Sequence, residues 1–531
     1  MACAEKLFLR PNIAAEPLVD SWYAWPHLIA PATYARNLSE RHLRIMDSYI
    51  NDPAAHAAAA EDSRLAGGPF MNFGHQRVAE VAALRDRTIE ARRNLLGLSD
   101  AICKLDAMLA EDAKGYSLQP LYEALPDCLQ GYVELAYNLC NQPSFRFIER
   151  LMYASRFYDS SAQSLRLSAV CDDSRAFIFS TPRLDDCKSL NWTVPFGSNA
   201  VDAFFQLKSE PASYAEILDL VEVPPRQESA LRSLLTESEP RRSSRYEGPG
   251  VRWRYFGHAC ILIESRDCTI LTDPAVSYPH DGASKRFTYS DLPESIDFVL
   301  LTHAHQDHVL LETLLQLRRR IGTILVPRNS GGYLQDPSLK LILQACGFKR
   351  VRELDEMEEL DCDGVTIQAI PFCGEHCDLD IRSKTAWLVR VGAHSMLLTA
   401  DSRNINPALY EHVHDQTGDI ETLFVGMECD GAPLSWIYGP LLTRRLDRAM
   451  DQSRRANASD CSSALSLVEQ FNCRELYVYA MGQEPWLHFI SSIRYDECSN
   501  PIVESRRLLE IARERGLAGE RLFGWREREL E

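Results

Sequence analysis

The sequence predicts an α/β protein of two domains, with a mixed α/β domain over residues 1–245 and a sheet-rich domain over residues 246–531. Three observations predict this arrangement. The chain has 531 residues, more than one ordinary domain. Apolar residues at helical spacing dominate residues 40–160, whereas short apolar runs bounded by turn residues dominate after residue 250. Between them, residues 236–250 are polar and contain Pro and Gly, which is typical of a linker.

The first domain opens with helical sequence. In residues 76–96 (QRVAEVAALRDRTIEARRNLL), apolar side chains recur at three-to-six-residue steps with charges between them. Short aromatic and β-branched runs of the kind found in strands follow, such as RAFIFST at 175–181. The domain carries no catalytic motif, and its histidines (His27, His42, His56 and His75) have no ligand-like spacing. We therefore expect a scaffold, a dimer interface or a docking surface.

The second domain is a succession of short apolar runs, each bounded by Gly, Pro, Asp or Asn. Such runs are typical of buried strands. A helical pattern, VLLETLLQLRRRIG at 309–322, alternates with them. We expect a sheet core with helices outside it, with strands in residues 251–265, 268–274, 298–303, 322–327, 365–372, 385–392, 395–401, 422–427 and 475–481.

Composition and charge exclude several classes of protein. The formal net charge of −18 argues against binding to nucleic acid and to anionic membranes, which require basic surfaces. The 16 cysteines have no pattern, so we expect reduced thiols and no disulfide framework. The N-terminus lacks a signal-peptide core, and no run of about 18 apolar residues could span a bilayer. These features favour a cytoplasmic protein.

The strongest motif follows the apolar run IDFVLL. It is Thr302-His303-Ala304-His305-Gln306-Asp307-His308, with four potential metal ligands within six residues at a strand end. Imidazoles and carboxylates are ligands of divalent transition metals. In extended backbone His303 and His305 point the same way, and Asp307 and His308 can face a second ion after the chain turns. A polar loop that holds three histidines by chance is far less probable than a metal site.

This segment resembles the metallo-β-lactamase superfamily, and other landmarks match in order. FGHACILIE and CTILTDP, with His258 and Asp273, resemble its opening strands, and both residues are expected to orient backbone or ligand histidines. SMLLTADS places Asp401 where the superfamily has the aspartate that bridges two metals. The resemblance covers about residues 246–531. It implies an αββα sandwich with a dinuclear site at one edge.

The departures from that superfamily concern two ligand positions. Where a hydrolase supplies another histidine, this chain has IPFCGEHCDLD, so either Glu375 or His376 takes the position. Ahead of Asn500-Pro501, where phospholipase-like relatives have a histidine, the chain has Asp-Glu-Cys-Ser; His488 lies upstream at the wrong spacing. Replacing imidazole with carboxylate suits a harder, more oxidisable ion. The change favours oxygen activation over hydrolysis.

The whole chain resembles the diiron β-hydroxylases of nonribosomal peptide pathways, of the chloramphenicol-pathway type, through THAHQDH, CGEHC and TADS and through its long N-terminal domain. The resemblance implies a monooxygenase that uses two iron ions, dioxygen and an external reductant. Its substrate would be an amino acid, with aromatic ones such as p-aminophenylalanine among the candidates, held as a thioester on a peptide synthetase carrier domain in antibiotic biosynthesis. By motif, one iron is held by His303, His305 and Glu375 and the other by Asp307 and His308, while Asp401 bridges.

Glu428, in FVGMECDG, is a third catalytic candidate beside Glu375 and Asp401; it would hydrogen-bond a ligand or shift toward the cluster, and the alternative is a surface acid at a strand end. We favour Glu375 over His376 as the ligand. Remaining candidates are expected to have ordinary roles: Cys373 and Cys377 as packing thiols, His412 and His414 as solvated side chains, and the arginine runs 241–245, 318–320 and 454–455 as solvated faces, one of which could meet an acidic carrier domain.

Two other functions compete with the oxygenase. One is a dinuclear zinc hydrolase of phospholipase or nuclease type, and the other is a binding protein stabilised by a structural metal. Structural metal sites are closed, whereas this ligand set is open and rich in carboxylate, which argues against the binding protein. We also expect partners beyond the carrier domain, namely an electron donor and a second copy of the chain in a homodimer.

Overall fold

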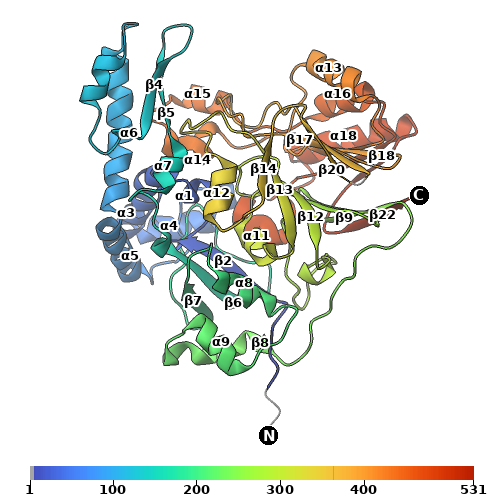
Figure 1. Cartoon of the computed structure of the whole chain (residues 1–531), viewed down its shortest axis with the longest axis horizontal. Coiled ribbons are helices and arrows are strands. Elements are labelled where there is room, and N and C mark those ends of the chain that lie inside the picture. The colour runs from blue at the N-terminus through green and yellow to red at the C-terminus, as the bar shows by residue number, and fades with distance from the viewer. Residues whose placement is uncertain (1–4, 363) are drawn as a thin grey trace.

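Two seven-stranded sheets face each other in the second half of the chain (Figure 1). The computed structural model describes residues 5–362 and 364–531; residues 1–4, with which the first predicted domain begins, lie outside the described part. The first sheet has the order β14-β13-β12-β11-β10-β9-β22. Its strands are β9 (Val251–Gly257), β10 (Cys260–Glu264), β11 (Thr269–Thr272), β12 (Ile296–Leu300), β13 (Ile321–Pro327), β14 (Val351–Leu354) and β22 (Arg526–Leu530).

The second sheet has the order β15-β16-β17-β18-β19-β20-β21. Between the sheets lies an apolar core in which Trp253 makes edge contacts with Phe424 and Tyr477, at ring-centroid distances of 5.2 and 4.7 Å. The strands are β15 (Glu359–Cys362), β16 (Val365–Ile370), β17 (Ala386–Val391), β18 (His394–Leu398), β19 (Thr422–Gly426), β20 (Glu475–Tyr479) and β21 (Ala518–Arg521).

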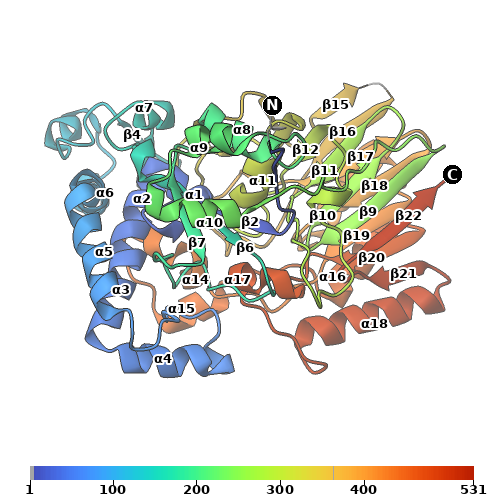
Figure 2. The same cartoon turned by 90° about the horizontal axis from the view of Figure 1, so that it is seen from below.

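Helices cover the outer faces of both sheets (Figure 2). Buried side chains of α13 (Pro407–Thr417), α16 (Cys461–Gln470) and α18 (Asn500–Glu514) share a core with the outer face of the second sheet. On the first sheet, α11 (Leu311–Leu317) and α12 (Leu339–Ala345) take this place. The predicted sandwich, its strand runs and its outer helices are confirmed.

The N-terminal half has a four-stranded antiparallel sheet, β3-β2-β6-β7, flanked by helices. It packs directly on the sandwich, because one apolar core extends from Leu7 to Ile490. The strands are β2 (Ile13–Val19), β3 (Trp22–Tyr23), β6 (Gln163–Ala169) and β7 (Ser189–Thr193), and the longer helices are α3 (Arg44–Asn51), α4 (Pro53–Glu61), α5 (Val78–Ala91), α6 (Arg93–Asp112), α8 (Asn199–Gln206) and α9 (Tyr214–Val221).

The strand expected at 175–181 is a wrong prediction. The segment instead bends in a turn, in which the Thr181 amide donates to the Phe177 carbonyl at 3.1 Å. Its aromatic rings pack against a distant residue, since Phe179 lies 5.3 Å from Trp436 between ring centroids. The apolar pattern that resembles a strand therefore reflects tertiary packing.

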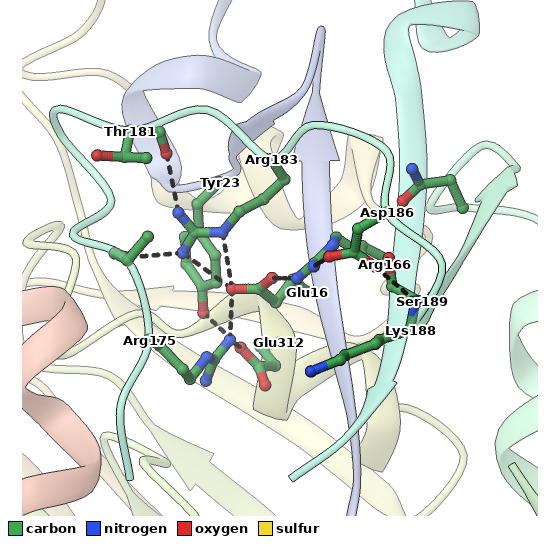
Figure 3. Close-up of polar contacts among 12 residues, drawn as sticks. Glu16, Tyr23, Arg166, Arg175, Thr181, Arg183, Asp186, Lys188, Ser189 and Glu312 are labelled. Carbon is green, nitrogen blue, oxygen red and sulfur yellow. Dashed lines mark hydrogen bonds and ion pairs between the residues drawn. The ribbon is translucent and has the colours of Figure 1, made fainter. Parts of the chain in front are cut away.

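A network of buried charges also joins the two halves (Figure 3). Arg175 donates to Glu16 of β2 at 2.9 Å and to Glu312 of α11 at 2.7 Å.

No helix among residues 5–362 and 364–531 combines the length and the apolar character needed to cross a bilayer.

Candidate metal centre

Four strands of the sandwich end at one edge in residues with left-handed backbone. His258 follows β9, Asp273 follows β11, Ala400 follows β18 and Ala480 follows β20, with φ values of 50°, 31°, 46° and 51°. Such conformations are uncommon for residues other than glycine and gather at functional sites. Thr302, the first residue of the metal motif, lies just beyond the end of β12.

The structure brings the motif histidines and Asp401 together. His303 Nε2 lies 3.1 Å from His305 Nδ1, and the Asp401 carboxylate lies 2.9 Å from His308 Nε2 and 3.6 Å from His303 Nε2. All four side chains are buried. Asp401 thus lies between the histidine at the end of the strand and the histidine after the turn.

Asp273 and Thr302 orient two of these rings. Asp273 accepts a hydrogen bond from His308 Nδ1 at 2.8 Å and another from the Thr302 hydroxyl at 2.6 Å. Because its proton is given to Asp273, the Thr302 hydroxyl accepts from His303 Nδ1 at 3.0 Å. Both rings therefore present Nε2 to the cluster, which is how carboxylates behind metal-binding histidines act. The expected orienting role of Asp273 agrees with this geometry.

His258 lies closer to the cluster than its sequence position indicates. Its Nε2 is 3.2 Å from His308 Nε2 and 3.5 Å from an Asp307 oxygen, and the three side chains form one group of potential ligands. Its Nδ1 accepts a hydrogen bond from the Gly482 amide at 3.2 Å. A ring that accepts at Nδ1 carries its proton on Nε2, so in this tautomer His258 donates toward Asp307 and does not offer Nε2 to a metal.

The loop at 373–378 brings both alternatives, Glu375 and His376, into the cluster. Glu375 Oε1 lies 3.2 Å from His305 Nδ1, whereas His376 stacks on the His305 ring at 4.7 Å and forms a ligand-like group with His303 and His305. Three of the loop residues, Glu375, Cys377 and Asp378, have φ of 54° to 61°. This backbone points two consecutive side chains into the same site.

Buried groups in the cluster lack enough partners within the protein. Asp401 Oδ1 and both ring nitrogens of His376 are buried with no hydrogen-bond partner. Burial disfavours the charged form and, together with the nearby Asp401 and Asp307, raises the pKa of Glu375 well above its usual range. Burial also lowers the pKa of His303 well below 6.5, which leaves its nitrogen lone pair free. Such groups fit a pair of cations.

Glu428 faces the same cluster. Burial, followed by repulsion from Glu375 and Asp401, raises its pKa well above the usual range. With His305, Asp307, Glu375 and Asp401 it lines a cavity of about 440 Å³, which we call the metal chamber. These surroundings differ from those of an isolated surface acid, which was the alternative for Glu428.

The N-terminal half supplies one wall of the metal chamber. Arg64, Ala66 and Gly67 line it together with residues of the cluster, and the Trp436 indole donates to the Gly67 carbonyl at 3.0 Å. An added Cβ at Gly67, where φ is +76°, would lie 3.3 Å from Ser492. No sequence motif marks these wall residues, since they are distant in the chain and meet only in the fold.

The remaining candidates lie elsewhere or have other contacts. His412 is exposed and His414 pairs with Asp419 on the surface of α13, as expected for solvated side chains. His488, Cys373 and Cys377 belong to none of the groups of potential ligands found among the described residues. Two of the arginine runs differ from the predicted solvated faces. Arg318 is buried and donates to Asp202 at 2.8 Å. Arg454 donates to the Cys377 carbonyl at 2.8 Å, and Arg455 lines the metal chamber.

Known proteins resemble both halves. Residues 8–240 match the diiron non-heme beta-hydroxylase N-terminal domain, and residues 252–403 match the beta-lactamase superfamily domain. The 4-amino-L-phenylalanyl-[CmlP-peptidyl-carrier-protein] 3-hydroxylase of Streptomyces venezuelae is 42% identical over 97% of this chain and 98% of its own length. The crystal structure of CmlA, a diiron beta-hydroxylase from the same organism, has a TM-score of 0.93 at 39% identity, covering 99% of this chain and all of that one.

Proposed function

The chain belongs to the diiron non-haem β-hydroxylases, and from this premise we propose that it hydroxylates the β-carbon of an amino acid carried as a thioester on a peptide synthetase carrier domain, in antibiotic biosynthesis. The enzyme is an oxidoreductase that uses two irons. Per turnover, one C–H bond, one dioxygen, two electrons and two protons give one C–OH group and one water. The electrons come from an external donor.

The proposed ligands divide between two irons. His303, His305 and Glu375 would hold one, Asp307 and His308 the other, and Asp401 would bridge, as its place between His303 and His308 supports. The two irons, when bound, supply the activation of dioxygen. We prefer Glu375 to His376 because Glu375 lines the metal chamber beside Asp401 and Asp307.

The metal chamber would receive the aminoacyl group. Trp436, Ile437 and Ile493 give it an apolar wall in addition to the carboxylates, and this wall can contact the side chain of the substrate. Burial and the nearby Glu375 and Asp401 raise the pKa of Glu428 well above its usual range, and the protonated form can donate a hydrogen bond into the chamber. This pairing of an apolar wall with a cluster of potential iron ligands is the observation that carries the proposal.

Turnover of the free amino acid and of the carrier-loaded amino acid would test the substrate. A carrier is recognised through protein surface, so we expect clear hydroxylation of the loaded form and little of the free one. Equal rates on both would contradict the proposal.

We further propose that the protein works in the cytoplasm as a homodimer formed through its N-terminal half. Light scattering that gives the mass of a monomer would exclude the dimer.

The zinc-hydrolase alternative is not favoured by these relatives. Metal content separates it from the oxygenase in one measurement. We expect two irons per chain with a near-ultraviolet absorption from oxygen-to-iron charge transfer. Two zincs and a colourless protein would support hydrolysis instead.

A further inference from the structure

Tyr438 holds the side of the His305 ring that faces away from the cluster. Its hydroxyl oxygen lies 2.6 Å from His305 Nε2, and both side chains are buried. The other ring nitrogen, Nδ1, lies 3.1 Å from His303 Nε2 and 3.2 Å from Glu375. When Nε2–H donates to the phenol oxygen, the lone pair on Nδ1 is directed into the cluster.

Tyr438 ends α14 (Leu434–Tyr438), a helix of a single turn followed by η7 (Gly439–Leu441). A helix this short is not stable by itself, so its position depends on its neighbours. Two buried arginines of the N-terminal half hold the backbone on both sides of Tyr438. Arg41 donates to the carbonyls of Trp436 and Ile437, and Arg36 donates to those of Pro440 and Leu442 at 3.1 and 3.0 Å.

These two arginines come from adjoining helical elements of the N-terminal half, one of which is a π-helical turn. Arg36 lies in α2 (Pro31–Asn37), and Arg41 lies in the π turn η1 (Leu38–Leu43). In a regular α-helix, side chains five residues apart differ in direction by about 140°. A π turn hydrogen-bonds to the fifth residue and reduces this angle, and such turns are frequent at functional sites.

We propose that Tyr438 is a positioning residue for His305, and that the N-terminal half acts on the metal centre through it. The inference rests on the proposed role of His305 as an iron ligand. The partner on the outer nitrogen of a metal-binding histidine fixes its tautomer and its orientation. The arginine contacts keep that partner in place. The motif-free half of the chain thus becomes part of the metal site.

The test is the affinity of the apoprotein for Fe(II), with the absorption spectrum of the reconstituted protein as a second readout. Tyr438→Phe removes only the hydroxyl and should weaken binding at one iron about ten- to a hundredfold. Tyr49→Phe is the matched control, because its buried hydroxyl donates to the Gly74 carbonyl at 2.8 Å, away from the cluster. This control should bind both irons as the unchanged protein does.

Arg41→Lys provides a second route to the same readout. Lysine cannot reproduce the planar guanidinium that spans two carbonyls and lies 4.5 Å over the Phe179 ring, so iron binding should weaken in the same direction. Should Tyr438→Phe fail to fold, Arg41→Lys decides. Unchanged iron affinity and an unchanged spectrum in the folded variant would overturn the inference.

His305→Ala separates this inference from the function it rests on. If His305→Ala loses an iron while Tyr438→Phe keeps both at full affinity, the positioning role is wrong and the ligand assignment stands. If His305→Ala still binds two irons, the ligand assignment fails and the positioning role fails with it. Loss of iron in both variants, with the Tyr49→Phe control intact, supports both.

Discussion

The buried charges around Glu16 and those around Asp401 differ in how they are balanced. Glu16 receives hydrogen bonds from Arg166, Arg175 and Arg183 (Figure 3), and Glu312 receives them from Arg175, Tyr23 and Tyr278. Burial alone would raise the pKa of Glu16, yet the guanidiniums of Arg183 and Arg175 hold it well below its usual range. This network is balanced by the protein itself.

In the cluster around Asp401, carboxylates lie beside imidazoles and not beside guanidiniums. Burial and mutual repulsion raise the pKa of both Glu375 and Glu428. Buried charges are stable only when opposite charges and hydrogen bonds compensate them. The network around Glu16, which arginines balance, therefore holds the fold together. The cluster around Asp401 needs added cations.

The largest expected effect is at Asp401. Asp401→Asn removes the charge between His303 and His308, so we expect loss of both irons and of detectable hydroxylation, measured as iron per chain and product formed. Asp202→Asn is the control. It removes the carboxylate that accepts a hydrogen bond from Arg318 at 2.8 Å, in a region outside the metal cluster, and should keep both irons. Full iron content in Asp401→Asn would contradict the proposed bridge.

Glu375→His tests which neighbour in the loop is the ligand. Exchanging an anionic ligand for a neutral one removes a compensating charge for Fe(III) and makes zinc more competitive. Hydroxylation should collapse while the fold survives, and His376→Ala should be much milder. These outcomes are measured as turnover and as iron-to-zinc ratio.

The opposite result has a clear meaning. If Glu375→His continues to hydroxylate and His376→Ala loses iron, then His376 is the ligand. The group formed by His303, His305 and His376 would then act as an ordinary three-histidine site.

Glu16→Gln should lower stability and leave the metal site intact. It removes the buried carboxylate shared by Arg166, Arg175 and Arg183, of which Arg183 is itself buried, and breaking a buried pair in this way costs about 3–5 kcal/mol. Urea unfolding monitored by circular dichroism measures the change in unfolding free energy, and iron per folded chain is the control. An unchanged free energy would show that the network is not structural.

Acid should also reduce the contribution of this network to the free energy of unfolding, by less than Glu16→Gln does at neutral pH. The pKa of Glu16 is lowered by folding, so the unfolded chain takes up its proton first as the pH falls. The stabilisation is complete above the unfolded pKa of about 4.3 and declines below it. Midpoints of thermal unfolding between about pH 5 and about pH 2 should therefore fall less steeply in Glu16→Gln than in the unchanged protein.

The metal motif could be predicted from sequence because its ligands are local. His303, His305, Asp307 and His308 lie within six residues, and Asp401 follows a recognisable strand. The sandwich could be predicted for the same reason, since each strand carries its own apolar run. In both cases, the positions of residues that are close in the sequence follow from the backbone geometry of one short segment.

The rest depends on contacts between distant segments. The approach of His258 to Asp307 follows from a left-handed residue at the end of β9, and the approach of Tyr438 to His305 follows from two arginines about 400 residues away along the chain. Neither leaves a periodic pattern. The choice between Glu375 and His376 stayed open for a related reason, because the strained loop brings both side chains to the cluster.

The wall of the metal chamber formed by Arg64, Ala66 and Gly67 has a consequence for recombination between relatives. Under the proposed role of the metal chamber, substrate range depends on residues on both sides of residue 245, in a loop of the N-terminal half and in the strand-end loops of the sandwich. A chimaera that exchanges only the lactamase-like half would inherit the chemistry of one parent and half of the other parent's chamber. Libraries that diversify selectivity should therefore vary residues 64–67 and residues 436–437 together.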